Sequence, residues 1–172
     1  GLGWTTYSAL GSLAYPAFER RVWKKFGSAL KRGEYDLVHR ITPVSPTNPS
    51  LLAKRCSKIG VPFLLGPLNG GTPWPKEFPG LRAKEREWLS FVRGAHRLLP
   101  GYRATREYAS AIILAANAAW EETPEKYRSK CFRLPENEIE ESKFPKPAHR
   151  HDPSEPLRVV FIGRLVPYKG AD

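Results

Sequence analysis

The chain has 172 residues, which is long enough for one ordinary domain with a core of normal size. Its apolar content of 41% excludes a disordered chain, and no apolar run approaches the roughly 20 residues that cross a bilayer. The net charge of +11 favours anionic partners, namely nucleic acid, an acidic membrane surface or phosphorylated ligands.

The positive charge is uneven along the chain. Between Glu19 and Lys58 there are ten Lys and Arg residues and three Asp and Glu residues, a net charge of +7. No RRM, KH, zinc-finger or helix-turn-helix pattern accompanies this surplus, so we expect no nucleic acid as partner. A basic face in peripheral contact with the anionic inner face of a membrane is the alternative that the charge favours.

Cysteine, histidine and methionine usage adds three expectations. The two cysteines lack CxxC spacing, which indicates reduced thiols in a cytoplasmic protein. The four histidines lack metal-ligand spacing, so we expect no metal. The chain contains no Met and begins with Gly, so we expect an internal fragment of a longer protein.

The first half of the chain predicts a helix and then a strand–helix–strand unit. Residues 1–15 have no clear period, and a helix should run from Pro16 to about Arg32, with Gly33 ending it. One set of residues recurs every three to four positions and predicts its buried face: Phe18, Val22, Phe26 and Leu30. Strands over 36–40, with Leu37 and Val38 buried, and over 61–65 flank a helix over 50–59. Such a unit predicts parallel strands.

The second half continues the alternation of helices and strands. Helices are expected over 82–96, about 102–108 and 124–130, and strands over 111–115 and 131–134. Residues 142–156 contain four prolines among charged residues and predict an exposed linker. Val159 to Ile162 then predict a buried strand of a new domain.

Candidate ligand-binding residues follow the first two strands. The carboxyl ends of parallel strands share one edge of a sheet, where ligands bind. His39 ends the first strand, and it could serve chemistry or simply hydrogen-bond beneath the proline-rich loop. Asn69, Gly70 and Gly71 follow the second strand. They could let a ligand approach the backbone, with Asn69 bonding a sugar hydroxyl, or they could make a tight turn.

A second candidate site follows the last predicted strand. Gly163 ends that strand, Arg164 comes next, and Lys169 and Gly170 stand where a helix could begin. A turn at a helix N-terminus presents backbone N–H groups and two cations to one point, which favours a phosphate or diphosphate. The alternative is a solvated basic loop.

Four segments resemble a known family. FIGRLVPYKGAD resembles the GR-L-x-x-x-KG signature that opens the donor-binding domain of GT4-type retaining glycosyltransferases. YDLVHRITPVSPTNPS, VPFLLGPLNGG and LPENEIEESKF resemble successive strand-end segments of that family's N-terminal domain, in the same order. The resemblance runs from about Glu34 to the end of the chain. It departs at Glu138, where the family usually has Gly.

The resemblance implies an α/β fold of the GT-B type, with a Rossmann-like parallel sheet in each of two domains. Residues 1–141 would be a partial N-terminal, acceptor-side domain, and 142–156 the linker. Residues 157–172 would begin the C-terminal nucleotide-sugar-binding domain, truncated after its first strand.

The resemblance also implies an enzyme that moves a sugar, with retention, from a nucleotide-sugar donor to a glycan, lipid-linked or small-molecule acceptor. Four residues would hold the donor diphosphate: Gly163, Arg164, Lys169 and Gly170. Four would line the acceptor side: His39, Asn69, Gly70 and Gly71. No metal and no cofactor is implied, because the nucleotide-sugar is a substrate. The family's Glu-x7-Glu segment would lie beyond residue 172, so we expect this chain alone to be inactive.

Two other classes of function stay open at this stage. A GT-B-like protein that binds sugar-phosphates or anionic membranes without turnover would share these motifs up to residue 172. A basic nucleic-acid-binding domain would instead bind oligonucleotides in a salt-sensitive manner.

Overall fold

The computed structural model describes residues 4–70, 97–135, 139–143, 154–156, 159–160 and 162–163, with the backbone alone over 4–13 and at 141. In chain order, its elements are α1 (Trp4–Lys31), β1 (Val38–Arg40), α2 (Leu51–Lys58), β2 (Phe63–Leu68), α4 (Tyr102–Tyr108), β3 (Ala111–Leu114), α5 (Asn117–Glu122), the 3-10 helix η2 (Glu125–Lys130), β4 (Cys131–Arg133) and the 3-10 helix η3 (Glu141–Lys143).

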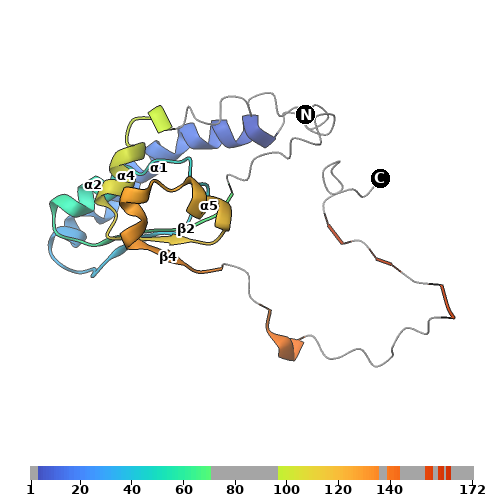
Figure 1. The fold of residues 1–172 in the computed structure, drawn as a ribbon. Coiled ribbons are helices and arrows are strands. Elements are labelled where there is room, and N and C mark those ends of the chain that lie inside the picture. The colour runs from blue at the N-terminus through green and yellow to red at the C-terminus, as the bar shows by residue number, and fades with distance from the viewer. Residues whose placement is uncertain are drawn as a thin grey trace.

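The strands form a four-stranded parallel sheet in the order β1-β2-β3-β4. This arrangement confirms the α/β class and the predicted strand–helix–strand unit, and it is consistent with a Rossmann-like fold. Because each strand lies beside its predecessor in sequence, right-handed crossovers place the connecting helices on one face of the sheet. Figure 1 shows α1, α2, α4 and α5 together on that side.

The core lies between this helical layer and the sheet. Alternate strand residues point toward the helices and pack against α2, and they are almost fully buried: Phe63, Leu65, Leu68, Ile112 and Leu114. Cys56 of α2 is fully buried among them. Burial raises the pKa of the Cys56 thiol to about 11, so the thiol is protonated at neutral pH.

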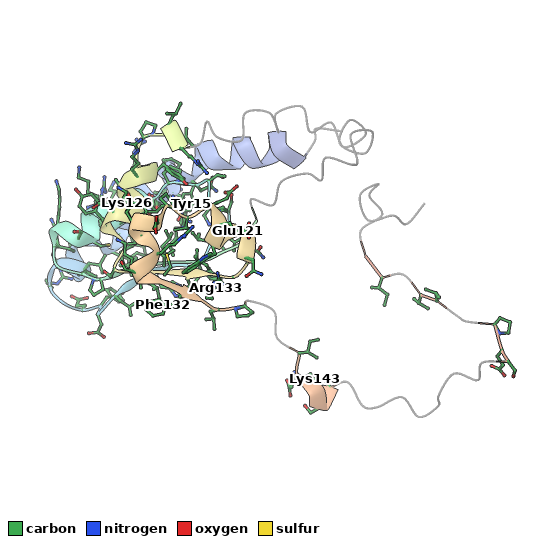
Figure 2. All side chains as sticks on the ribbon, viewed as in Figure 1. Tyr15, Glu121, Lys126, Phe132, Arg133 and Lys143 are labelled. Atoms are coloured by element: carbon green, nitrogen blue, oxygen red, sulfur yellow. The ribbon has the colours of Figure 1, made fainter. Side chains whose placement is uncertain are left out.

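The remaining strand residues, which alternate with the buried ones, lie on the opposite face of the sheet. His39, Leu64 and Ala111 share it by register, as do Ile113 and Phe132. Phe132 is 61% exposed, and in Figure 2 it lies on the side away from the helices. The described part of the chain therefore covers one face of this sheet and leaves the other partly open.

Helix α1 differs from its prediction in start and in buried face. It begins at Trp4, and Pro16 lies inside it, so the predicted start at Pro16 was wrong. Proline there removes one backbone hydrogen bond and crowds the carbonyl of the preceding turn, a local cost that a 28-residue helix can tolerate. Phe18 is 58% exposed, whereas Glu19 and Leu30 are buried. The buried face is thus rotated away from Phe18 toward Glu19.

The rotation has a polar cause at the N-terminus of α2. The Ser50 hydroxyl donates to one Glu19 carboxylate oxygen, and the backbone N–H of Leu51 donates to the other. Ser50 is also the N-cap of α2, accepting from the N–H of Leu52. A carboxylate at this point satisfies donors that have no partner within the helix and complements the positive end of the helix dipole.

Three further expectations differ from the structure. Leu37 precedes β1 and is 51% exposed instead of buried. Strand β2 does not stop at Leu65 but runs to Leu68 through the cis Gly66–Pro67 bond, with an irregular register that accommodates the proline. Helix α5 was missed, because its six residues are too few to show a period.

The buried strand expected over 159–162 is also not formed in the described residues of that stretch, which are 159–160 and 162. Val159, Val160 and Ile162 lie outside any strand and are 78%, 80% and 92% exposed. A strand requires a neighbour to pair with, and the sheet described above does not include this segment.

We expect Glu19→Ala to lower the free energy of unfolding by at least about 2 kcal/mol, because it leaves a buried hydroxyl and a partly buried backbone N–H without an acceptor. Urea unfolding followed by far-ultraviolet circular dichroism measures the change.

Glu34→Ala is the matched control. Glu34 pairs with Arg32 on the surface, where the two side chains are 51% and 63% exposed. We expect a change below about 0.5 kcal/mol. Equal effects of the two substitutions would contradict the role given to Glu19.

Candidate functional site

The carboxyl edge of the sheet begins with the loop of residues 41–49 after β1. Pro43, Pro46 and Pro49 lie in this loop and have no backbone N–H, so the loop is poor in donors for its own carbonyl groups. Two arginine side chains supply donors instead.

Arg40, the last residue of β1, is 5% exposed and supplies the first set of hydrogen-bond donors. Its Nη1 donates to the Asn48 carbonyl at 2.8 Å, and its Nη2 donates to the Pro43 carbonyl at 3.2 Å. Its guanidinium also lies 5.8 Å from the ring centroid of Tyr15. Burial lowers the pKa of Arg40, and it raises the pKa of Tyr15, where Glu19 adds to the effect.

Arg106 of α4 supplies the second set and is 3% exposed. Its Nη2 donates to the Pro46 carbonyl at 2.7 Å, and its guanidinium stacks 3.9 Å from the ring centroid of Tyr102. Burial lowers the pKa of Arg106. Both arginines therefore hold the backbone of the loop, and they fix the shape of this edge.

His39 is exposed on the open face of the sheet. Its Nε2 lies 2.8 Å from the carbonyl oxygen of Gly66, which accepts the imidazole proton. This bond links β1 to the irregular part of β2. The bond gives His39 a structural role. The sequence had left two roles open for this residue, a structural one and a chemical one.

Asn69 and Gly70 follow β2 at the same edge. The N–H of Asn69 donates to the Val44 carbonyl at 2.8 Å, which ties this loop to the loop after β1. The Asn69 side-chain oxygen accepts from the Gly70 N–H at 2.7 Å, and Gly70 has a φ of 97°. The structure thus brings Asn69 and Gly70 beside residues 41–49, as predicted, whereas Gly71 lies outside the described residues.

The predicted donor-binding residues fall mostly beyond the part of the chain that the structure describes. Gly163 lies in an exposed bend. Arg164, Lys169 and Gly170 are outside the described residues, and their role stays a prediction.

Sequence reasoning missed a basic cluster at the end of β4, formed by Arg128 and Arg133 around Trp120. Arg133 is the last residue of that strand and stacks on Trp120 of α5. The available signal was an arginine one residue before the end of the strand predicted over 131–134, because that end faces the same edge as His39 and Asn69.

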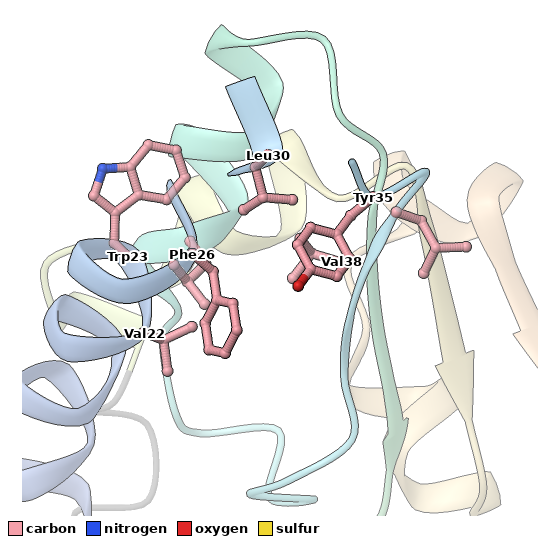
Figure 3. A pocket seen from close by; sticks show the side chains of 8 residues that line it. Val22, Trp23, Phe26, Leu30, Tyr35 and Val38 are labelled. Atoms are coloured by element: carbon pink, nitrogen blue, oxygen red, sulfur yellow. The ribbon is translucent and has the colours of Figure 1, made fainter. Parts of the chain in front are cut away.

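An apolar pocket of about 190 Å³ lies between α1, α2 and β1, away from this edge. Figure 3 shows Trp23, Phe26 and Leu30 facing Tyr35 and Val38 across it. Its complete lining is apolar or aromatic: Val22, Trp23, Phe26, Leu30, Tyr35, Leu37, Val38 and Leu52. Two cations lie on its aromatic rings, with Arg55 5.3 Å from the ring centroid of Trp23 and Lys25 5.3 Å from that of Phe26.

No group of three or more His, Cys, Asp or Glu residues in the described ranges is arranged to hold a metal ion. Among the same residues, no helix has the length and apolar character needed to pass through a bilayer. Comparison with family models, with curated proteins and with solved structures gave no match.

We expect Gly66→Ala to destabilise the protein by more than about 3 kcal/mol. Gly66 has a φ of 122°, and a Cβ there would stand 2.3 Å from the Ile113 carbonyl oxygen, inside the sheet. Urea unfolding of the two proteins measures the loss.

Gly33→Ala separates the cost of backbone strain from the cost of the steric clash. Gly33 has a φ of 77°, but a Cβ there would meet nothing within 4 Å. We expect a loss of about 1 kcal/mol, from backbone strain alone. A loss at Gly66 no larger than that at Gly33 would show that the close approach of β2 and β3 does not matter.

Proposed function

We propose that this chain is part of a GT-B-type retaining glycosyltransferase that transfers a sugar from a nucleotide-sugar to an acceptor. The observation that carries the proposal is the occurrence of four family-like segments in the family's order. The first segment spans β1 and its following loop, the second spans β2 and its following loop, and the third follows β4. These segments therefore stand at or next to the carboxyl ends of parallel strands, where α/β proteins bind ligands.

The chemistry proposed for the motif residues is electrostatic. As the glycosidic bond of the donor breaks, negative charge grows on the leaving nucleoside diphosphate. Arg164 and Lys169 would stabilise that charge more in the transition state than in the ground state, which accelerates transfer. Gly163 and Gly170 would let the backbone approach the diphosphate closely.

On the acceptor side, the loop of residues 41–49 and the Asn69–Gly70 turn would contact the acceptor. Their backbones are held by Arg40, Arg106 and the Asn69–Val44 hydrogen bond, so the edge is rigid before an acceptor binds. Preorganisation of this kind lowers the entropic cost of binding. We also propose a cytoplasmic location, on the basis of the two free cysteines.

We expect Arg164→Ala and Lys169→Ala each to lower kcat/KM for sugar transfer by about 100-fold or more in the full-length protein. Release of nucleoside diphosphate from a panel of nucleotide-sugars measures the rate.

Arg103→Ala is the control, because Arg103 is an exposed cation of α4. It should leave kcat/KM unchanged. Unchanged rates for all three variants, or sugar transfer by the 172-residue chain alone, would overturn the proposed roles.

A second candidate function is binding to an anionic membrane surface, and the exposed face of α1 favours it. Phe18 and Phe26 of α1 are 58% and 37% exposed, and the exposed cations Arg21 and Lys25 lie near them on the helix. Tyr35, which follows α1 and meets the ring of Phe26 edge-on, is 46% exposed. Aromatic rings beside cations are the composition of helices that lie in a lipid interface. The apolar pocket next to this face could take part of an acyl chain.

We expect the protein to co-sediment with vesicles of mixed phosphatidylglycerol and phosphatidylcholine, and not with phosphatidylcholine alone. Because each basic residue near an anionic surface contributes about 1 kcal/mol, Arg21→Glu combined with Lys25→Glu should weaken binding tenfold or more.

Two exposed lysines on α2 provide the control for the double variant on α1. The double variant Lys54→Glu, Lys58→Glu on α2 changes the net charge equally, and it should weaken binding much less. Equal weakening by both double variants would mean that net charge, and not the face of α1, attracts the protein.

A further inference from the structure

Two arginines and a tryptophan form a cluster at the carboxyl end of β4. The guanidinium carbon of Arg133 lies 4.3 Å from the ring centroid of Trp120, and that of Arg128 lies 5.6 Å from it. Arg133 belongs to β4, Arg128 to η2 and Trp120 to α5. Three elements therefore converge on one indole ring, and Figure 2 shows Arg133 at this end of the sheet.

Among the described residues, neither arginine side chain takes part in a hydrogen bond or an ion pair. The ion pairs of the described residues join Arg32 to Glu34, Lys126 to Glu107 and Lys143 to Glu140, and none involves the cluster. Glu121 and Glu122 follow Trp120 in sequence, yet neither pairs with Arg128 or Arg133 in the described chain.

The Nε of Arg128 is one of two buried side-chain donors of the described residues that have no hydrogen-bond partner, the other being the Nε of Arg40. A buried donor without an acceptor is costly, and in folded proteins nearly all such donors are paired. An acceptor that the chain does not provide would relieve this cost.

We propose that Trp120, Arg128 and Arg133 form a phosphate-binding site. Contact with the indole ring holds both guanidinium groups at this point, and the exposed Arg133 directs N–H groups without a partner among the described residues to solvent. A planar guanidinium with free N–H groups matches the oxygens of a phosphate in a two-bonded geometry. The site is also at the edge of the sheet where ligands of parallel α/β proteins bind.

Phosphate binding itself does not depend on the proposed transferase activity. If the chain does transfer sugar, the site lies on the acceptor side, and the bound phosphate would belong to a phosphorylated acceptor. This second step rests on the proposed function, whereas the binding test below involves no turnover.

The test is a titration of the protein with inorganic phosphate at constant ionic strength, followed through the arginine Nε–H resonances in nitrogen-15 NMR spectra. We expect saturable shifts of the Arg128 and Arg133 signals. Acetate at the same ionic strength should shift them at least tenfold more weakly. Equal responses to acetate and phosphate, or a linear response to phosphate, would overturn the assignment.

Variants of each arginine complete the experiment. Arg133→Gln and Arg128→Gln should each raise the Kd for phosphate tenfold or more, because each removes charged hydrogen bonds. Arg133→Lys keeps the charge but not the planar fork, and it should also weaken binding. Arg103→Gln, the control on α4, should leave the Kd unchanged. Thermal unfolding of each variant confirms that it is folded, and an unchanged Kd in folded Arg133→Gln and Arg128→Gln would overturn the proposal.

Discussion

The arrangement of helices on the sheet depends on the contact between the Glu19 carboxylate and the N-terminus of α2. Ser50 is the residue at which three helices meet. Its hydroxyl donates to Glu19 of α1, its own helix is α2, and its backbone N–H donates to the Thr105 hydroxyl of α4 at 2.6 Å. A buried carboxylate is costly unless its hydrogen bonds are satisfied, and here two donors and a helix dipole satisfy it. The polar contact thus fixes how α1 lies over a core that is otherwise apolar.

The same logic explains the buried arginines at the carboxyl edge. A loop with three prolines lacks N–H donors, so its buried carbonyl groups need donors from elsewhere. Arg40 and Arg106 provide them at Asn48, Pro43 and Pro46. Removing such a guanidinium would leave several acceptors unpaired at once. The loop is therefore irregular in conformation and still held in place.

Elements with local signals were predictable from the sequence. The bounds of α4 matched, and β3 and β4 differed from their predictions by one residue at one end, because apolar runs and turn residues define them within a few positions. The buried face of α1 was not predictable, since the partner of Glu19 is 31 residues away and a glutamate on a helix normally faces water. The extension of β2 through Gly66 and Pro67 depends on the close backbone of β3, which no local pattern contains.

In the candidate site, too, local sequence patterns do not determine the role of a residue. Arg40 and Arg133 are each the last residue of a strand, and the alternation of β1 and β4 directs both toward the helical side of the sheet. From the sequence the two arginines are equivalent candidates for binding an anion.

Arg40 is buried and bonds two carbonyl groups of its own loop, so its Nη donors are already engaged. Arg133 is exposed and lies on an indole ring, and its N–H groups have no partner among the described residues. What distinguishes a structural arginine from a ligand-binding one is therefore the part of the fold that lies beside each strand end. Beside Arg40 is the loop after β1, whose carbonyl groups need donors, whereas beside Arg133 is α5, which supplies an aromatic ring instead.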